Sequence, residues 1–182
     1  AFSNTKVRAL GSKCEVTEQM LNAIEKSDIV DNILNWSKFK QNNELKKKGG
    51  AKKAKILGIT KLDDANFAGT SRSKDCTLIL TEGDSAKALA MSGIGVVGRD
   101  FYGAFPLKGK LLNVREAPHA QILKNEEIQN IAKSLGLQFG KEYTEVRSLR
   151  YGHVMIMADK DSDGSRVKGL VMNLLQIYGR TL

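Results

Sequence analysis

Residues 154–158 form an uninterrupted apolar run, Val-Met-Ile-Met-Ala, which ends abruptly in the alternating carboxylates of Asp159, Asp161 and Asp163 and closes on Gly164. Such a run predicts a strand buried on both faces, and in sheets of such strands ligands bind beyond the carboxyl ends. Neighbouring carboxylates repel one another, and a hard divalent cation is the usual reason for keeping them together. The stretch therefore predicts a metal site at the end of a buried strand.

A second acidic stretch follows another apolar run upstream. Residues 76–80, Cys-Thr-Leu-Ile-Leu, also have the composition of a buried strand, and Thr81, Glu82 and Gly83 come directly after them. Gly83 allows a tight turn, and residues 86–91 are good helix formers. If the two strands are neighbours in a parallel sheet, Glu82 faces Asp159 and Asp161 across one crevice, which is the arrangement that magnesium-assisted phosphoryl transfer requires.

Three other interpretations of the aspartates are weaker. A calcium EF-hand loop also begins with alternating aspartates and a glycine, but it needs Glu at its twelfth position, where this chain has Leu170, and a helix before it. An aspartyl-phosphate phosphatase places its nucleophile after a buried strand but leaves Glu82 unexplained. An Asp- and Gly-rich surface turn accounts for one acidic motif more readily than for two.

Two glycine-containing stretches match nucleotide-binding loops only in part. Residues 93–98, Gly-Ile-Gly-Val-Val-Gly, match the dinucleotide fingerprint, but they follow a predicted helix and lead into an extended Val96-Val97. The fingerprint instead follows a strand and opens a helix. A strand within residues 101–112 precedes Lys108 and Lys110, which can hold a phosphate, although the spacing of the glycines is not that of a P-loop.

Composition bounds the class of protein. The chain has 182 residues, 41% of them apolar, which is enough for one domain and an extension, and no apolar run approaches the roughly 20 residues that span a bilayer. Two cysteines without metal-ligand spacing suit a reducing compartment. The formal net charge is +9, although residues 74–182 hold both acidic clusters. A basic surface around an acidic pocket is expected to hold a polyanion.

Residues 1–73 are predicted to be a mainly helical extension. Apolar residues from Val16 to Phe39 recur at helical spacing and predict a helical pair, in which Trp36 and Phe39 serve packing. Six lysines within residues 46–55 surround a glycine pair and predict a mobile loop, with a solvated linker, a phosphate contact and a nuclear import signal as its possible roles. A polar turn at residues 69–73 marks the predicted boundary to a domain over residues 74–182.

Two amphipathic helices are predicted in that domain. Residues 125–135 place Ile128, Ile131 and Leu135 on one face, and Gly136 ends the helix. After the aspartates, apolar residues from Val167 to residue 175 form the inward stripe of a last helix.

The acidic motifs resemble the Toprim metal-binding signature of topoisomerases and primases. Glu82-Gly83-Asp84-Ser85-Ala86 carries its first part, and Asp159-x-Asp161-x-Asp163-Gly164-Ser165 carries its second part. The chain resembles eukaryotic DNA topoisomerase II more closely, because further segments match that family in order. These segments are residues 61–66, 76–87, 95–100, 105–110, 112–117 and 149–152.

The resemblance implies the Toprim fold, an α/β architecture with a Rossmann-like parallel sheet flanked by helices, within the DNA cleavage and rejoining core of a homodimer. It also implies catalytic roles for Glu82, Asp159 and Asp161, which would hold magnesium, with Asp163 supporting a second ion. Lysine side chains and one arginine would contact the DNA. These are Lys108, Lys110 and Arg166, of which Arg166 stands where the family usually has histidine.

The resemblance further implies functions that need other domains. In that family the nucleophile is a tyrosine of a downstream winged-helix domain, and ATP is hydrolysed by a separate domain. We therefore expect this chain to bind magnesium and double-stranded DNA but, alone, neither to cleave nor to relax DNA. The full-length protein would be an ATP-dependent DNA topoisomerase of the nucleus, without a membrane segment.

Two alternatives stay open at this point. A Toprim-type nuclease or primase explains the acidic residues but not the flanking topoisomerase-like segments. A folded DNA- or protein-interaction module that no longer binds metal would explain the fold but gives no reason for the intact set of four acids.

Overall fold

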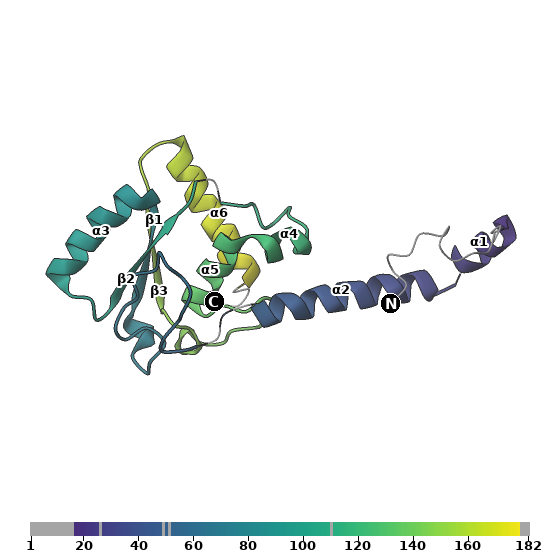
Figure 1. The fold of residues 1–182 in the computed structure, drawn as a ribbon, viewed down its shortest axis with the longest axis horizontal. Helices are drawn as coiled ribbons and strands as arrows, with labels where there is room; N and C mark the ends of the chain where they lie inside the picture. The colour runs from purple at the N-terminus through teal and green to yellow at the C-terminus, as the bar shows by residue number, and fades with distance from the viewer. Residues whose placement is uncertain (1–16, 26, 49, 51, 110, 179–182) are drawn as a thin grey trace. The chain divides into compact units, whose positions relative to one another are not determined.

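The computed structural model describes residues 17–25, 27–48, 50, 52–109 and 111–178 (Figure 1). The packing of the chain divides it into two compact units, one up to Lys40 and one from Gln41 onward. Helix α1 (Glu18–Glu25) and the first part of α2 (Ile29–Lys48) belong to the first unit, and all strands belong to the second. The helical pair predicted near the amino terminus is confirmed.

The packing role predicted for Trp36 and Phe39 is wrong for the described residues. Their exposed fractions are 67% and 63%, and Ile29, Ile33 and Leu34 on the same helix are also more than half exposed. The apolar spacing therefore identified a helix correctly. It did not identify a partner, because helical periodicity carries no information about what covers the apolar residues.

The mobile loop predicted for residues 46–55 is also wrong for its described part. Helix α2 continues to Lys48, and the buried Gly50 donates its N–H to the carbonyl oxygen of Leu137 over 2.7 Å. A Cβ at Gly50 would lie 2.7 Å from the Cα of Lys133, so only glycine fits there. The carbonyl oxygen of Lys53 accepts a hydrogen bond from Arg150 over 2.7 Å. The lysine-rich composition gave no indication of these backbone hydrogen bonds, because they depend on residues distant in the sequence.

The described sheet has three parallel strands in the order β2-β1-β3. Strand β1 (Thr77–Glu82) lies in the middle, between β2 (Tyr102–Leu107) and β3 (His153–Met157). The register pairs Glu82 with Leu107 and Thr81 with Met157. The predicted pairing of the two acid-bearing strands is thereby confirmed.

Helices cover both faces of the sheet, as Figure 1 shows, with α3 (Gly83–Val97) on one side. On the other side lie α4 (His119–Lys124), α5 (Glu126–Leu135) and α6 (Ser162–Tyr178). Alternate residues of β1 point to opposite faces, so that Ile79 packs with α3 whereas Leu78 and Leu80 belong to the core of α5 and α6. This is the predicted α/β fold.

Strand β3 is not buried on both faces as its composition predicted. It lies at the edge of the described sheet, and Met155 is 48% exposed. Helix α3 packs mainly on β1 and β2, and of this face of β3 Met157 packs against the cluster of Ile79 and Ala90 while Met155 stays about half exposed. An apolar run thus predicted a strand correctly but overestimated its burial.

The prediction of an extended Val96-Val97 is wrong as well. Helix α3 continues through Val97 and ends at Gly98, whose φ of +97° suits glycine. Residues 93–98 therefore complete a helix instead of opening one, and the exclusion of a dinucleotide-binding loop holds.

Capping residues define both ends of α5, of which the sequence predicted Gly136. The side chain of Asn125 accepts a hydrogen bond from the N–H of Ile128 over 2.9 Å, and Gly136 adopts the left-handed conformation at the other end. Two short 3₁₀ turns, Ser73–Asp75 and Val146–Ser148, complete the described elements.

The unit that holds the sheet includes residues upstream of the boundary predicted after residue 73. Ala65 and Ala68 are buried in the same core as Leu78 and Leu80. A boundary at residue 73 therefore stays a prediction about the family domain, whereas the packing divides the chain after Lys40. Among the described helices, none combines the length and the apolar character needed to cross a lipid bilayer.

Candidate functional site

Chemically active residues follow all three strands where the strands' carboxyl ends meet; we call this end of the sheet the acidic edge. Strand β1 ends at Glu82, Lys108 follows β2 directly, and Asp159 comes two residues after β3. The backbone N–H of Asp159 donates to Oε2 of Glu82 over 3.4 Å, which brings the two acidic stretches together across 77 residues of sequence. The two acidic stretches therefore meet at the carboxyl end of the sheet.

The turn from β1 into α3 leaves the side chain of Glu82 available. Thr81 is fully buried, and its hydroxyl donates to the carbonyl oxygen of Gly83 over 3.0 Å. Gly83 has a φ of +86°, which a residue with a side chain rarely adopts. Glu82 occupies the N-cap position of α3 but makes no side-chain capping hydrogen bond. Its carboxylate therefore reaches toward β3 instead of the helix end.

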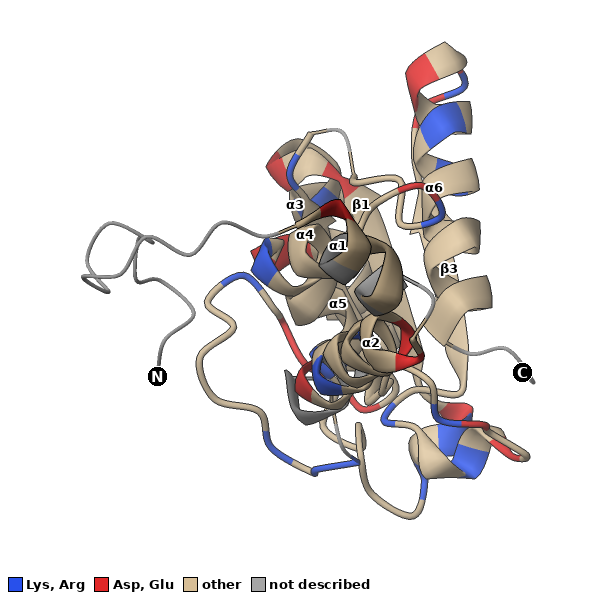
Figure 2. Cartoon of the chain, turned by 90° about the vertical axis from the view of Figure 1, so that its right-hand side faces the viewer, with Lys and Arg blue, Asp and Glu red and all other residues tan. Residues whose placement is uncertain are grey.

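The aspartate loop is shaped by a close backbone approach. Oδ1 of Asp161 accepts a hydrogen bond from the N–H of Gly164 over 2.7 Å, which caps the first turn of α6. A Cβ at Gly164 would lie 2.1 Å from the carbonyl oxygen of Asp159, so the loop can close only over glycine. Asp163 is exposed in the same turn. Figure 2 shows acidic and basic segments in succession at this end of α6.

The four acids predicted to bind metal make no ion pair with a described base. The ion pairs among the described residues involve Asp63, Asp64 and Asp84, and none involves the four acids predicted to bind metal. Those four are Glu82, Asp159, Asp161 and Asp163.

Oxygen ligands of this kind are the ones that magnesium prefers, so the donor set fits a hard divalent cation. In the described part of the chain, however, no three His, Cys, Asp or Glu side chains are gathered closely enough to hold a metal ion. The fold brings the acids to one end of the sheet, but the described side chains do not converge into a metal coordination shell.

Asp84 differs from the other acids at this edge. Its carboxylate accepts a hydrogen bond from Nζ of Lys61 over 2.6 Å, and this bond holds the pKa of Asp84 below its usual value, with Lys87 and Lys108 adding to the effect. Sequence reasoning did not identify Lys61 as part of the site. No sequence pattern could have identified the contact, because Lys61 and Asp84 are 23 positions apart and only the tertiary structure brings them together.

The predicted DNA-contacting residues are placed differently. Lys108 is exposed at the edge, and its backbone N–H donates to Oε1 of Glu127. Partial burial raises the pKa of Glu127. Arg166 is exposed on α6, one turn after the aspartate loop, whereas Lys110 lies outside the described residues.

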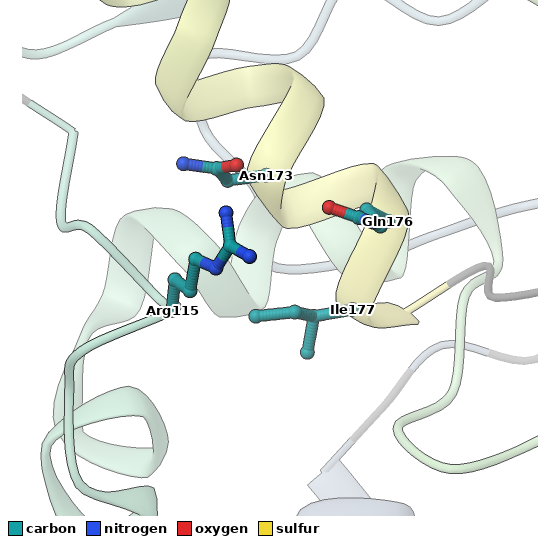
Figure 3. Close-up of a pocket in the computed structure, with 4 residues that line it drawn as sticks. All are labelled: Arg115, Asn173, Gln176 and Ile177. Carbon is teal, nitrogen blue, oxygen red and sulfur yellow. The ribbon is translucent and has the colours of Figure 1, made fainter.

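A hollow of about 210 Å³ lies elsewhere, toward the carboxyl-terminal half of α6. Figure 3 shows Arg115 extending toward Asn173 of that helix, with Gln176 and Ile177 also lining the hollow. None of the four acids lines it. The acidic edge is therefore not part of this hollow.

The Arg150-Tyr151 pair, which superficially matches an Arg-Tyr nucleophile pair, is structural. Both side chains are buried, with exposed fractions of 0% and 1%. The Tyr151 hydroxyl donates to Asp64 and accepts from the N–H of Ala65 over 2.9 Å. Burial, followed by the charge of Asp64, raises the pKa of Tyr151 far above its usual value. This hydroxyl is therefore unsuited to attack a phosphate.

Comparison with known proteins places this geometry in a family. The Toprim domain family matches residues 77–181. DNA topoisomerase 2 of Pisum sativum is 61% identical over 98% of this chain, and DNA topoisomerase 2-beta of Homo sapiens is 56% identical over 92% of it. The chain spans only 12% and 11% of the length of these two relatives.

A solved structure shares both fold and sequence. It is the crystal structure of the DNA-binding, cleavage and re-ligation domain of Plasmodium falciparum topoisomerase II, with a TM-score of 0.69 and 52% identity. The similarity covers 71% of this chain and 18% of that chain. At this identity the likeness extends beyond the fold to the sequence.

Proposed function

Because the chain belongs to the Toprim domain family, we propose that it supplies the magnesium-binding half of the DNA cleavage and religation site of a type II DNA topoisomerase. The observation that supports this most strongly is the pairing of β1 with β3, which brings Glu82 within hydrogen-bonding distance of the Asp159 backbone. Four acids that make no ion pair with a described base then share one edge with Lys108.

In this proposal Glu82, Asp159 and Asp161 hold one magnesium ion and Asp163 supports a second. Magnesium bound there would polarise the scissile phosphate and stabilise the leaving 3′ oxygen. Glu82 would also exchange a proton with that oxygen when the strand is resealed. Lys108, Lys110 and Arg166 would bind the DNA phosphates on either side of the acids.

The attacking nucleophile would come from outside this chain. Three of its four tyrosines are buried, and the fourth, Tyr102, begins β2 at the end of the sheet opposite to Glu82. We therefore propose that this chain alone neither cleaves nor relaxes DNA. Relaxation of a supercoiled plasmid by the purified chain would contradict this.

The wider assignment concerns the whole protein. We propose that it is an ATP-dependent DNA topoisomerase that acts as a homodimer on double-stranded DNA in the nucleus, with ATP bound by another domain. The support is the identity of 56–61% with proteins named DNA topoisomerase 2 from plant and animal sources.

A magnesium titration followed by backbone amide NMR tests the metal site. Saturable shifts are expected in residues 82–85 and 159–165 of the native chain, and they should be lost in Asp159→Asn/Asp161→Asn. The control is Asp75→Asn, which removes an exposed carboxylate next to the amino end of β1. Native amides at the edge that do not shift, even with a DNA duplex added, would contradict the proposal.

That negative outcome would favour a second candidate, a folded DNA- or protein-interaction module without metal. One observation supports it, since the described acidic side chains do not form a coordination shell. A salt series with a fluorescent duplex then measures DNA binding by itself. Lys108→Ala should lower the affinity and reduce the salt slope by about one unit, whereas Lys74→Ala, near the other end of the sheet, should change neither.

A further inference from the structure

The segment of residues 61–66, Lys-Leu-Asp-Asp-Ala-Asn, lies beside β2, the strand on the other side of β1 from β3; we call it the latch. It is fixed to the sheet by an antiparallel bridge to β2. The N–H of Asp63 donates to the carbonyl oxygen of Ala104 over 2.9 Å, and the N–H of Ala104 donates to the carbonyl oxygen of Asp63 over 2.8 Å. The latch thus has a fixed position relative to the strands.

The latch holds the first turns of α3 through reciprocal contacts. Nζ of Lys61 lies 2.6 Å from Oδ2 of Asp84, in the first turn of the helix. In return, Nζ of Lys87 lies 2.5 Å from Oδ2 of Asp63 and donates to the carbonyl oxygen of Lys61 over 2.7 Å. Lys87 is only 17% exposed, so its pairing is partly shielded from solvent.

The latch also contacts the chain that enters β3. Asp64 accepts hydrogen bonds from the buried Arg150 and from Tyr151, which lie just before β3 begins at His153. One six-residue segment therefore contacts the elements that carry both acidic clusters. It reaches α3, which follows Glu82, and the entry to β3, which precedes Asp159.

Local structure alone does not fix the direction in which the Glu82 side chain points. The residue is the N-cap of α3, and no side-chain hydrogen bond caps the helix there. Gly83 follows with a positive φ. An uncapped helix start can fray or tilt, so its orientation depends on tertiary contacts. Among the described residues, the ion pairs made by this turn and the next are with the latch.

We propose that Lys61 is a positioning residue for metal binding: by holding Asp84, it sets the direction in which Glu82 faces the aspartates of β3. The assignment rests on the proposed function, since it takes the acidic edge as a magnesium site. It also gives Asp84 a structural role, because the charge of Asp84 is matched by Lys61 and not by the metal.

Positioning and simple charge balance predict opposite results for Lys61→Ala. If Lys61 acted only through its charge, removing a cation near four carboxylates would tighten magnesium binding. If Lys61 positions Glu82, the same substitution weakens binding, and loss of a residue that orients a ligand typically costs about tenfold in affinity. The sign of the change therefore separates the two explanations.

The experiment is a MgCl₂ titration of the complete chain, followed by the amide shifts of residues 82–85 and 159–165. We expect Lys61→Ala to weaken binding about tenfold, and Lys61→Arg, which keeps the charge and the reach, to restore it. The double variant Lys61→Ala/Asp84→Asn leaves the net charge unchanged, yet it should be weakened as much as Lys61→Ala. Lys74→Ala removes a remote positive charge and serves as the control.

A measurement without metal completes the test. In the magnesium-free chain, Lys61→Ala should speed amide hydrogen exchange in the first turn of α3 and leave the amides of residues 78–80 protected. Unchanged or tighter magnesium binding by Lys61→Ala would overturn the positioning role. If the native chain itself binds no magnesium at this edge, the proposed function fails first, and that outcome is distinguishable because it appears before any variant is compared.

Discussion

Replacing Arg150 with methionine removes a guanidinium that joins three parts of the chain. The side chain is fully buried and donates to the carbonyl oxygens of Lys53 and Ser134, each over 2.7 Å, and to the carboxylate of Asp64. Methionine fills similar space but leaves all three acceptors without this donor. Removing one partner of a buried ion pair costs about 3–5 kcal/mol. We expect about 3 kcal/mol, because the Asp64 side chain is 28% exposed and can be hydrated.

Urea unfolding of the complete chain, followed by the near-ultraviolet signal of the buried tyrosines, measures this loss. Trp36 is a poor reporter because it is exposed and lies in the other compact unit. With a slope of about 2 kcal/mol per molar, the midpoint should fall by about 1.5 M. The control Arg147→Met changes an exposed arginine and should shift stability by less than about 0.5 kcal/mol. A loss below about 1 kcal/mol for Arg150→Met at unchanged slope would refute the reasoning.

Three further predictions follow from other contacts. Gly164→Ala should destabilise the chain by about 1–3 kcal/mol because the new Cβ would clash with the Asp159 carbonyl oxygen. Gly169→Ala, in open space on the same helix, should instead stabilise it by about 0.5–1 kcal/mol. Urea unfolding midpoints compare the two variants, and equal effects would contradict the clash. Asn125→Ala should cost about 1 kcal/mol by thermal unfolding, and no change would argue against the cap. Burial raises the folded-state pKa of three tyrosines above that of the unfolded chain, so the folded state keeps these protons to a higher pH. The free energy of unfolding should therefore be unaffected below about pH 10 and fall above it, by up to about 1.4 kcal/mol per pH unit and tyrosine. A urea midpoint that does not change from pH 9 to 11 would contradict this. These tyrosines are Tyr143, Tyr151 and Tyr178.

Prediction from the sequence was most successful where a local pattern has one structural solution. The apolar runs before Thr81 and Asp159 correctly predicted two parallel strands, and the amphipathic pattern of residues 125–135 with Gly136 after it correctly predicted a helix and its end. The acidic residues at the strand ends were expected at one edge, and the contact of Glu82 with the Asp159 backbone agrees with this. Their roles in metal binding stay predictions until magnesium is titrated.

Prediction was weaker where burial depends on a partner. Met155 and Trp36 lie in correctly predicted elements but are exposed among the described residues, because periodicity fixes the type of an element and not what packs on it. The extended geometry predicted for Val96 failed for a related reason. Gly93 and Gly95 do not end the helix, because glycine weakens a helix without breaking it when tertiary packing supports the segment, and α3 continues through both.

The sequence by itself determined the α/β class, the strands, the positions of the acids and the resemblance to the topoisomerase family, because each follows from local spacing or a short motif. Only the tertiary structure decided which charges meet. Lys61 with Asp84, Lys87 with Asp63 and Arg150 with Asp64 are pairs that no local pattern reveals, since they join residues 23–86 positions apart. Among the described residues, the same folding leaves the four acids of the edge without an ion pair, because Lys61, Lys87, Arg99 and Arg150 are paired with Asp63, Asp64 and Asp84 instead.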